Sequence, residues 1–474
     1  DSGIDYLNQD FLNEDGSSKI LYLWDQESNY KSPPEGMLFG SEFTRDEINE
    51  AISNNNGDLS RDEIGTGTVT ASIAVSQGKN NINYKGIAPK AELIVVKLRS
   101  YISLFKEGRI NYQNTDFFVA ISYIIKKFKE INRPIILNFT VGTTSGRDIS
   151  QALLNTFEEL YQSGFILVSG AGNQGNTDTH TEGIIERVGD VKDIEIRIGE
   201  KQKNLPIEIW IDKPNRVKLS IISPTGEIID NLESKNTNNE RIKFLYEETE
   251  MIVNFTSPEL TTGDSLIFIR AYNLRAGIWK FRLTGQYIVG GKYYSWIPQR
   301  ELIDNETKFL NPVEYTTLTL PSTSRGAISV AYYNQNNNAT LSESSRGYTR
   351  DGRIKPDIAA GGTNALVTNP GGTTSLMTGA SVAGAVVSGC CALILQWAVS
   401  DGNYPDIYSE QIKSYIISGA KGRPGDVYPN RDWGYGMFDL QGIFDRIRET
   451  YSPRSDEYEE YKVNNLFIRK PKDL

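Results

Sequence analysis

Apolar residues in the first 195 positions follow two alternating patterns. Nearly continuous apolar runs predict buried strands at residues 91–98, 134–142 and 165–173. Residues 116–132 and 149–164 instead carry apolar side chains at helical spacing. The predicted apolar face of the first helix consists of Phe117, Ile121, Ile124, Ile125 and Phe128, with its lysines elsewhere. Alternating strands and helices predict an α/β fold with a doubly wound parallel sheet, covered on both faces.

The pattern changes near residue 195, where apolar residues begin to recur at every second position. Such alternation is visible in residues 207–211, 217–221 and 279–283, and turn sequences separate the runs. Several short strands with this spacing predict an antiparallel β-sandwich. We place this sandwich at residues 196–315, inserted into the α/β domain.

The α/β pattern returns after the insertion. We therefore expect residues 1–195 and 316–448 to form the two parts of one domain, followed by a charged tail at 449–474 that is either solvated or packed as an arm. Residues 382–399 carry no charge over 18 positions, long enough to span a membrane. Because this run is rich in Gly, Ala, Ser and Cys, we predict a buried core helix and no membrane span.

Composition narrows the possible functions. The 474 residues carry a net charge of −10, which argues against a nucleic-acid partner. The two cysteines are the neighbours Cys390 and Cys391, which predicts core residues and neither a disulfide framework nor a metal site. Residues 54–63 are rich in Asp and Asn but lack EF-hand spacing, so solvated turns are favoured over a calcium site. The sequence indicates no cofactor and does not determine whether a structural metal is bound.

Three polar residues lie where chemistry commonly gathers in α/β folds. Asp1 begins the stretch DSGID, Asn173 follows a predicted strand in VSGAGNQGN, and Ser381 opens the apolar helix in TGASVAG. An amide can stabilise an oxyanion, and a serine at a helix N-terminus lies near exposed N–H groups. A strand should precede Asp1 in such a sheet, so we expect the chain as given to be incomplete or processed at its start.

The order of these residues resembles that of the subtilisin-like serine proteases, peptidase family S8. In that family an Asp, a His in the motif G-H-G-T-x-V, an Asn and a Ser follow one another along an α/β chain. The stretch 344–362, SSRGYTRDGRIKPDIAAGG, also resembles a family signature. The stretches DSGIDYLNQDF, FGSEFTRDEINEAI and RDWGYG resemble the Csp subtilases of clostridial spores in particular. That resemblance implies that the inserted sandwich is a jelly roll.

The resemblance assigns a role to each position of the degenerate triad. Asp1 matches the triad aspartate, Ser381 the nucleophile and Asn173 the oxyanion residue, whereas Thr66 in GTGT stands in place of the histidine. The nucleophile motif has drifted as well, because Ala380 replaces the usual threonine and residues 383–389 depart from A-x-P-H-V-A-G.

Thr66 determines the expected activity. A serine hydroxyl needs a base with a pKa near neutrality to remove its proton, and a threonine cannot serve as that base. The only histidine in the chain, His180, could rescue catalysis if it reached Ser381. We favour instead a loop histidine bonded locally to Asp178 or Thr177.

The resemblance therefore implies a catalytically inactive, CspC-like pseudoprotease that regulates bacterial spore germination. Its expected partners are other Csp proteases or pseudoproteases, a cortex-hydrolase zymogen and a small-molecule germinant such as a bile salt, and its expected location is the spore. An extended peptide could pair with the predicted strand edge at 139–144. Two alternatives stay open: an active endopeptidase with a non-standard base that processes the zymogen, and a structural spore protein that uses the fold as a packing block.

Overall fold

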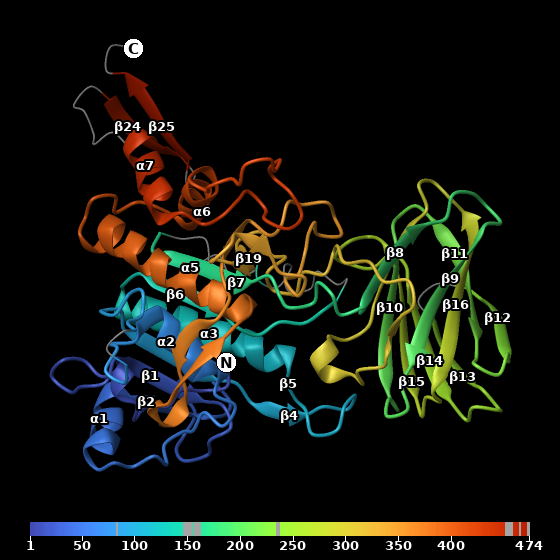
Figure 1. The fold of residues 1–474 in the computed structure, drawn as a ribbon, viewed down its shortest axis with the longest axis horizontal. Coiled ribbons are helices and arrows are strands. Elements are labelled where there is room, and N and C mark those ends of the chain that lie inside the picture. Colours follow the sequence, from blue (N-terminus) through green and yellow to red (C-terminus); the bar gives the residue numbers. More distant parts are fainter. Residues whose placement is uncertain are drawn as a thin grey trace.

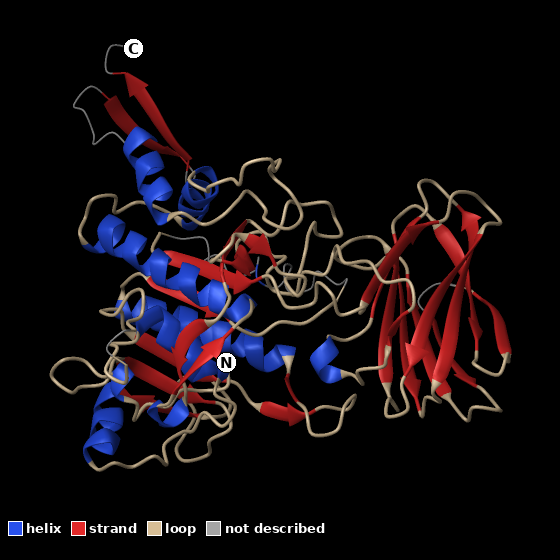
Figure 2. Ribbon diagram, viewed as in Figure 1, coloured by secondary structure: helices blue, strands red, loops and turns tan. Residues whose placement is uncertain are grey.

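The protein consists of an α/β part and an all-β part that lies to one side of it (Figure 1). Helices occur in the α/β part, while the all-β part is built from strands (Figure 2). The computed structural model describes residues 1–81, 84–145, 154, 163–233, 238–450, 458–463 and 466–471. The helix predicted at 149–164 therefore falls almost entirely outside the described residues.

A parallel sheet in two sections forms the centre of the α/β part. One section contains β2 (Ser41–Thr44), β1 (Ile20–Asp25) and β3 (Leu93–Lys97), and the other contains β20 (Ala339–Thr340), β19 (Ile328–Asn334), β7 (Phe165–Gly170), β6 (Ile135–Phe139) and, beside β19, β21 (Ile358–Gly361). All pairs are parallel except β1 with β2 and β19 with β20. The predicted strands at 91–98, 134–142 and 165–173 are thus confirmed as β3, β6 and β7.

Helices cover both faces of the sheet, as the side chains of β7 demonstrate. Phe165 and Leu167 belong to the core beneath α3 (Asn114–Ile131), whereas Ile166 and Val168 belong to the core beneath α5 (Ala380–Leu395). This alternation is what a strand buried on both faces requires, and it confirms the doubly wound α/β fold.

The apolar face predicted for α3 is confirmed, but one of its lysines lies in an unexpected place. Lys127 is 7% exposed, and its ammonium group lies 3.0 Å from Glu42 and 3.0 Å from Glu130. The same group lies 3.9 Å from the centre of the Tyr22 ring. Helical spacing alone could not predict this burial, because Glu42 belongs to β2 and Tyr22 to β1.

An apolar cavity of about 630 Å³ lies between β3 and β6. Its lining includes side chains from the two strands, α3 and α5. The backbone of Asp1 continues along β3, since Leu98 N–H donates to the Asp1 carbonyl at 2.9 Å. A strand that ran into Asp1 would follow this ladder and enter the cavity. The strand expected before Asp1 is compatible with this geometry and stays a prediction.

Two antiparallel sheets form the inserted part between His180 and Phe309. The larger runs in the order β13 (Asn238–Lys243), β14 (Glu250–Thr256), β15 (Ser265–Tyr272), β10 (Leu205–Ile211), β17 (Lys292–Trp296) and β8 (His180–Ile184), and the smaller in the order β12 (Ile228–Leu232), β11 (Arg216–Ile222), β16 (Gly277–Tyr287), β9 (Val191–Ile198) and β18 (Lys308–Phe309). The predicted boundary near residue 195 is too late, because β8 and most of β9 precede it. The sequence of β8, HTEGI, has no apolar alternation to mark a strand.

The two sheets enclose a common core, which makes the inserted part a sandwich. Alternate residues predicted to point inward, such as Ile209, Leu219 and Phe281, are at most 1% exposed and belong to this core. Ile278, on the other face of β16, is 39% exposed. Period-two alternation therefore identified the inward faces correctly.

The apolar run at 382–399 forms most of α5 and the turn that follows it. In the described residues, Ala380–Ser400 is the one helical stretch long and apolar enough to cross a membrane. Most of it is buried against β6, β7 and β19, and Cys390 and Cys391 are buried within it. It is the core helix that its small residues predicted.

The second α/β part ends in two further helices and a hairpin. Helix α6 (Ser409–Ser418) and helix α7 (Leu440–Thr450) follow α5 along the chain. The predicted tail contains β24 (Tyr458–Val463) paired with β25 (Leu466–Pro471), which extends from the α/β part (Figure 1).

A buried ion cluster lies at Asp357, directly before β21, and links this strand to Ser329 of β19. Asp357, 2% exposed, accepts Lys355 Nζ at 2.7 Å and Ser329 N–H at 2.7 Å, and lies 3.1 Å from Lys413 Nζ. Burial alone would raise the pKa of Asp357, but the two ammonium groups hold that pKa below its usual value. The carboxylate is therefore ionised and serves as the shared counter-ion of both lysines.

Replacing Asp357 by Asn should destabilise the protein strongly, because two ammonium groups would lose their counter-ion. We expect the free energy of unfolding in urea to fall by about 3–5 kcal/mol. Asp445→Asn, which removes an exposed partner of Arg448, is the matched control and should cost at most about 1 kcal/mol. Equal effects of the two substitutions would refute the buried charge cluster.

Candidate functional site

The carboxylate of Asp1 and the hydroxyl of Thr66 form the first half of the site. Thr66 is the first residue of α2 (Thr66–Val75), and its Oγ1 donates to Asp1 Oδ1 at 2.6 Å. Ser2 N–H donates to the same oxygen at 2.6 Å, and Thr70 Oγ1 lies 3.4 Å from Oδ2. The structure therefore brings together two positions that are 65 residues apart in the chain, as the triad assignment expects.

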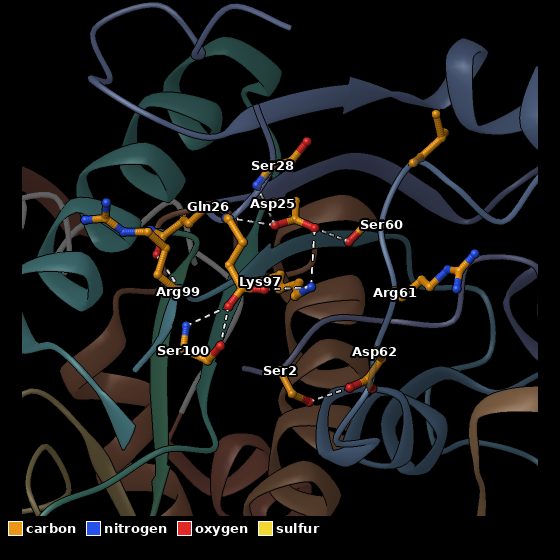
Figure 3. Close-up of polar contacts among 12 residues, drawn as sticks. Ser2, Asp25, Gln26, Ser28, Ser60, Arg61, Asp62, Lys97, Arg99 and Ser100 are labelled. Carbon is orange, nitrogen blue, oxygen red and sulfur yellow. Dashed lines mark hydrogen bonds and ion pairs between the residues drawn. The ribbon is translucent and has the colours of Figure 1, made fainter. Parts of the chain in front are cut away.

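The loop before α2 is held by Asp62, which the sequence analysis did not identify. This carboxylate is 7% exposed and accepts Gly65 N–H at 2.8 Å and Thr68 N–H at 2.8 Å, so it caps the helix. It also accepts the hydroxyl of Ser2 at 2.7 Å (Figure 3). An acidic residue a few positions before GTGT was the available signal, since such residues often cap helices.

The second glycine of GTGT allows α2 to approach the first residues of the chain closely. A side chain on Gly67 would place its Cβ 2.0 Å from the carbonyl oxygen of Gly3. No substitution fits at that distance without moving the backbone. The glycine therefore sets the distance between Asp1 and Thr66.

Ser381 and Asn173 form a second group of site residues, and among the described residues no hydrogen bond joins them to Asp1 or Thr66. Ser381 is the second residue of α5 and is half-buried, and its Oγ has one long contact, 3.5 Å to the carbonyl oxygen of Thr140. Asn173 is exposed just beyond β7, and its Oδ1 accepts Ala380 N–H at 2.9 Å. The predicted nucleophile and oxyanion residue thus lie side by side at the start of α5.

A second polar cluster lies where β1 and β3 end, at Asp25 and Lys97 (Figure 3). Lys97 Nζ is 2.9 Å from Glu27 and 3.6 Å from Asp25, and the hydroxyl of Ser60 donates to Asp25 at 2.6 Å. Burial would lower the pKa of Lys97, but the two carboxylates raise it above its usual value. Lys97 is therefore a protonated structural cation and no substitute for a catalytic base.

His180 lies in the sandwich, which corrects the expectation of a loop histidine bonded to Asp178 or Thr177. It is the first residue of β8, 1% exposed, with its ring 4.6 Å from that of Trp296. Its Nδ1 lies 3.3 Å from the carbonyl oxygen of Val313. Burial lowers its pKa to about 4. Within the described residues, no hydrogen bond joins His180 to Ser381.

The Asp-rich loop at 54–63 uses its carboxylates for other purposes. Asp58 forms an exposed ion pair with Arg61 at 2.9 Å, and Asp62 caps α2. Among the residues that the structure describes, no group of three or more His, Cys, Asp or Glu side chains is arranged to hold a metal ion.

The chain resembles known proteins over most of its length. Residues 1–193 and 305–436 match the Subtilase family, Peptidase S8, and the unmatched interval covers most of the sandwich. The structure of the Clostridium perfringens CspB protease is similar with a TM-score of 0.84 and 28% identity, over 94% of this chain and 92% of that chain. This similarity confirms the expected likeness to a Csp protease.

Two other solved structures are less similar. A mutant of the protease domain of PatA gives a TM-score of 0.46 and 14% identity, over 95% of this chain and 93% of that chain. Sphericase gives a TM-score of 0.47 and 15% identity, over 93% of this chain and 89% of that chain.

The burial of His180 should make folding stability depend on pH. Its pKa is about 4 in the folded protein against 6.5 unfolded, so the unfolded chain binds more protons between these values and stability falls with acidification. From pH 7 to 5, we expect this residue to remove about 2 kcal/mol from the free energy of unfolding. His180 is the only histidine in the chain. Urea titrations at pH 7 and pH 5 should therefore show that the His180→Phe variant lacks this decrease in the free energy of unfolding. The same pH dependence in both proteins would contradict the assignment.

Proposed function

The chain belongs to the subtilase family, and we propose that it is a pseudoprotease of that family, with a cleft that binds a peptide segment without cleaving it. One observation carries the proposal. At the position of the catalytic histidine, Thr66 uses its hydroxyl to donate to Asp1 Oδ1 at 2.6 Å.

A threonine at this position removes both proton transfers of the reaction. Attack by Ser381 requires a base to accept the hydroxyl proton, and departure of the amine requires an acid to return it. The Thr66 hydroxyl has no basicity near neutral pH, and it is already committed as a donor to Asp1. In subtilisin, loss of the histidine lowers turnover on the order of a million-fold.

Among the described residues, neither of the two basic groups considered above is placed to act as the base. His180 is buried against Trp296 in the sandwich and hydrogen-bonded there, and Lys97 is held protonated by Glu27 and Asp25. No observation therefore favours the alternative of an active endopeptidase with a non-standard base. Removing the nucleophile's base leaves the remainder of the cleft available for binding.

Binding requires backbone edges and a shaped cleft, neither of which depends on a base. An extended peptide adds to a strand edge through main-chain hydrogen bonds. The stretch 139–144, which follows β6, is the edge we propose for this contact. Its end is already bonded, because Thr143 pairs with Leu320 and Gln299 bonds its neighbours, so the peptide would pair at residues 139–141. No cofactor or metal is needed for this role.

For the biological role we propose regulation of spore germination, in a bacterial spore, by a CspC-like member of the family. The support is the likeness to a Clostridium perfringens CspB protease at 28% identity over 94% of this chain. In this proposal the protein acts beside an active relative of that kind, which processes a cortex-hydrolase zymogen. It relays the presence of a small-molecule germinant of the bile-salt class.

Labelling with a fluorophosphonate, which reacts with activated serines, tests the missing base directly. We expect no labelling of the wild type and labelling of Thr66→His, with a rate at least about 100-fold higher because a general base contributes 10²–10⁴-fold. The double variant Thr66→His with Ser381→Ala is the control and should not label.

Labelling of the wild type that disappears in Ser381→Ala would overturn the pseudoprotease proposal and require a base elsewhere. If neither the wild type nor Thr66→His labels, the protein is inactive for a second reason, a nucleophile motif that no longer orients Ser381.

A further inference from the structure

The loop of residues 297–307 joins β17 to β18 just before the chain leaves the sandwich, and this exit segment contacts two stretches beside the site that we call its walls. The first wall is the stretch after β6, from Thr140 to Thr144, and the second is the turn after β7, from Asn173 to Thr177. The chain enters the sandwich directly after the second wall, at His180, and leaves it after β18, which directly follows the exit segment. The exit segment therefore lies where both walls can be contacted by consecutive residues.

Gln299 in the exit segment holds the first wall. Its Nε2 donates to the carbonyl oxygen of Gly142 at 3.0 Å, and its Oε1 lies 3.4 Å from both Thr143 Oγ1 and Thr144 N. The hydroxyl of Thr144 donates to the carbonyl of Ile297 at 3.2 Å. One side chain thus contacts three consecutive residues of the wall that continues from the Ser381 contact.

Arg300 and Glu301, the next two residues, hold the second wall. The backbone N–H of Arg300 donates to Gln174 Oε1 at 3.1 Å, and Gln174 Nε2 donates to Glu301 at 3.0 Å. The guanidinium of Arg300 also donates to the carbonyl of Thr177. Gln174 is 4% exposed and directly follows Asn173, so these bonds position the oxyanion turn.

Arg300 also binds the remainder of the exit segment into one unit. Its Nη1 donates to the carbonyl oxygens of Asp304 at 3.2 Å, Asn305 at 3.1 Å and Thr307 at 2.8 Å. A guanidinium bonded to so many carbonyls fixes the loop as a rigid piece. A displacement of the sandwich that moves this loop must therefore move both walls together.

Gln202, inside the sandwich, extends this link to the hairpin of β4 (Ser100–Ile102) and β5 (Ile110–Tyr112). It is fully buried, its Oε1 accepts Asp304 N–H at 2.8 Å, and its Nε2 donates to the carbonyl of Phe105 at 2.9 Å. The Phe105 ring packs against the sandwich core. The sandwich end that carries Gln202 thus contacts the exit segment and a hairpin that begins next to β3.

We infer that Gln299 and Arg300 are positioning residues of the cleft, through which the inserted sandwich sets the spacing of the two walls. That an extended peptide binds between the walls rests on the function proposed above. The link between the sandwich and the walls rests on the hydrogen bonds alone. A partner bound to the sandwich is then sensed at the cleft through these two residues.

Hydrogen exchange measured by mass spectrometry tests the link without any ligand. In Gln299→Ala, peptides covering residues 139–145 should exchange about 2- to 10-fold faster, the effect of losing hydrogen bonds worth about 0.5–1.5 kcal/mol. In Arg300→Lys, the peptides covering 171–178 should respond by a similar factor. Glu306→Ala, an exposed change in the same segment, is the matched control and should leave both regions unchanged. Unchanged exchange in both variants would overturn the inference.

A second measurement separates positioning from general loosening. In the Thr66→His background, Gln299→Ala should slow labelling by a tetrapeptidyl phosphonate about 2- to 10-fold and leave labelling by a small fluorophosphonate unchanged, because only the peptide spans the wall. Equal slowing of both reagents would argue for a merely structural role and against positioning. If Thr66→His labels with neither reagent, the proposed function loses its support, while the exchange experiment still decides the link.

Discussion

The carboxylate of Asp1 requires hydrogen-bond donors, and this requirement organises the degenerate site. It lies half-buried at the end of a β-ladder, and a carboxylate in that position without donors would be strongly destabilising. Ser2 N–H supplies one donor and the hydroxyl of Thr66 another, both at 2.6 Å. Thr66 therefore donates to Asp1 the hydrogen bond that a triad histidine would donate, but it cannot transfer a proton.

The sandwich changes what this site can be used for. An insertion joined to its host by two strands could move independently, but here the exit segment is bonded to both walls of the cleft and to the hairpin of β4 and β5. Arg350 adds a further contact, with its guanidinium 2.7 Å from Asp264 and over the ring of Trp210. In the pseudoprotease proposed above, such a connection can convert binding at one part into a change of shape at the other.

Much of this could be predicted from the sequence, and the misses have a common physical cause. Periodicity identified β3, β6, β7, α3 and the inward faces of the sandwich, because these patterns report burial within one element. Partners from other elements determine three features that were missed: the burial of Lys127, the location of His180 and the role of Gln299. Gln299, for example, bonds Gly142, which is 157 residues away in the chain. The start of the sandwich was missed because β8 is too polar to alternate. The order of motifs along the chain was enough to propose four site residues: Asp1, Thr66, Asn173 and Ser381. The role of Asp62 could not be predicted in this way, because it depends on which helix this residue caps.

Two of the site residues, Asp1 and Asn173, also take part in holding the fold. The Asp1 carbonyl accepts Leu98 N–H in the ladder with β3, and the side chain of Asn173 accepts Ala380 N–H at the start of α5. Replacing Asn173 would therefore cost stability, whereas the Asp1 carbonyl belongs to the main chain and survives any substitution. An imidazole at position 66 would contribute one donor to Asp1, and a threonine hydroxyl contributes the same bond. The basicity of the imidazole is needed only for hydrolysis and contributes nothing to the stability of the fold. In the proposed pseudoprotease, loss of the base therefore abolishes hydrolysis while leaving the scaffold and its link to the sandwich intact.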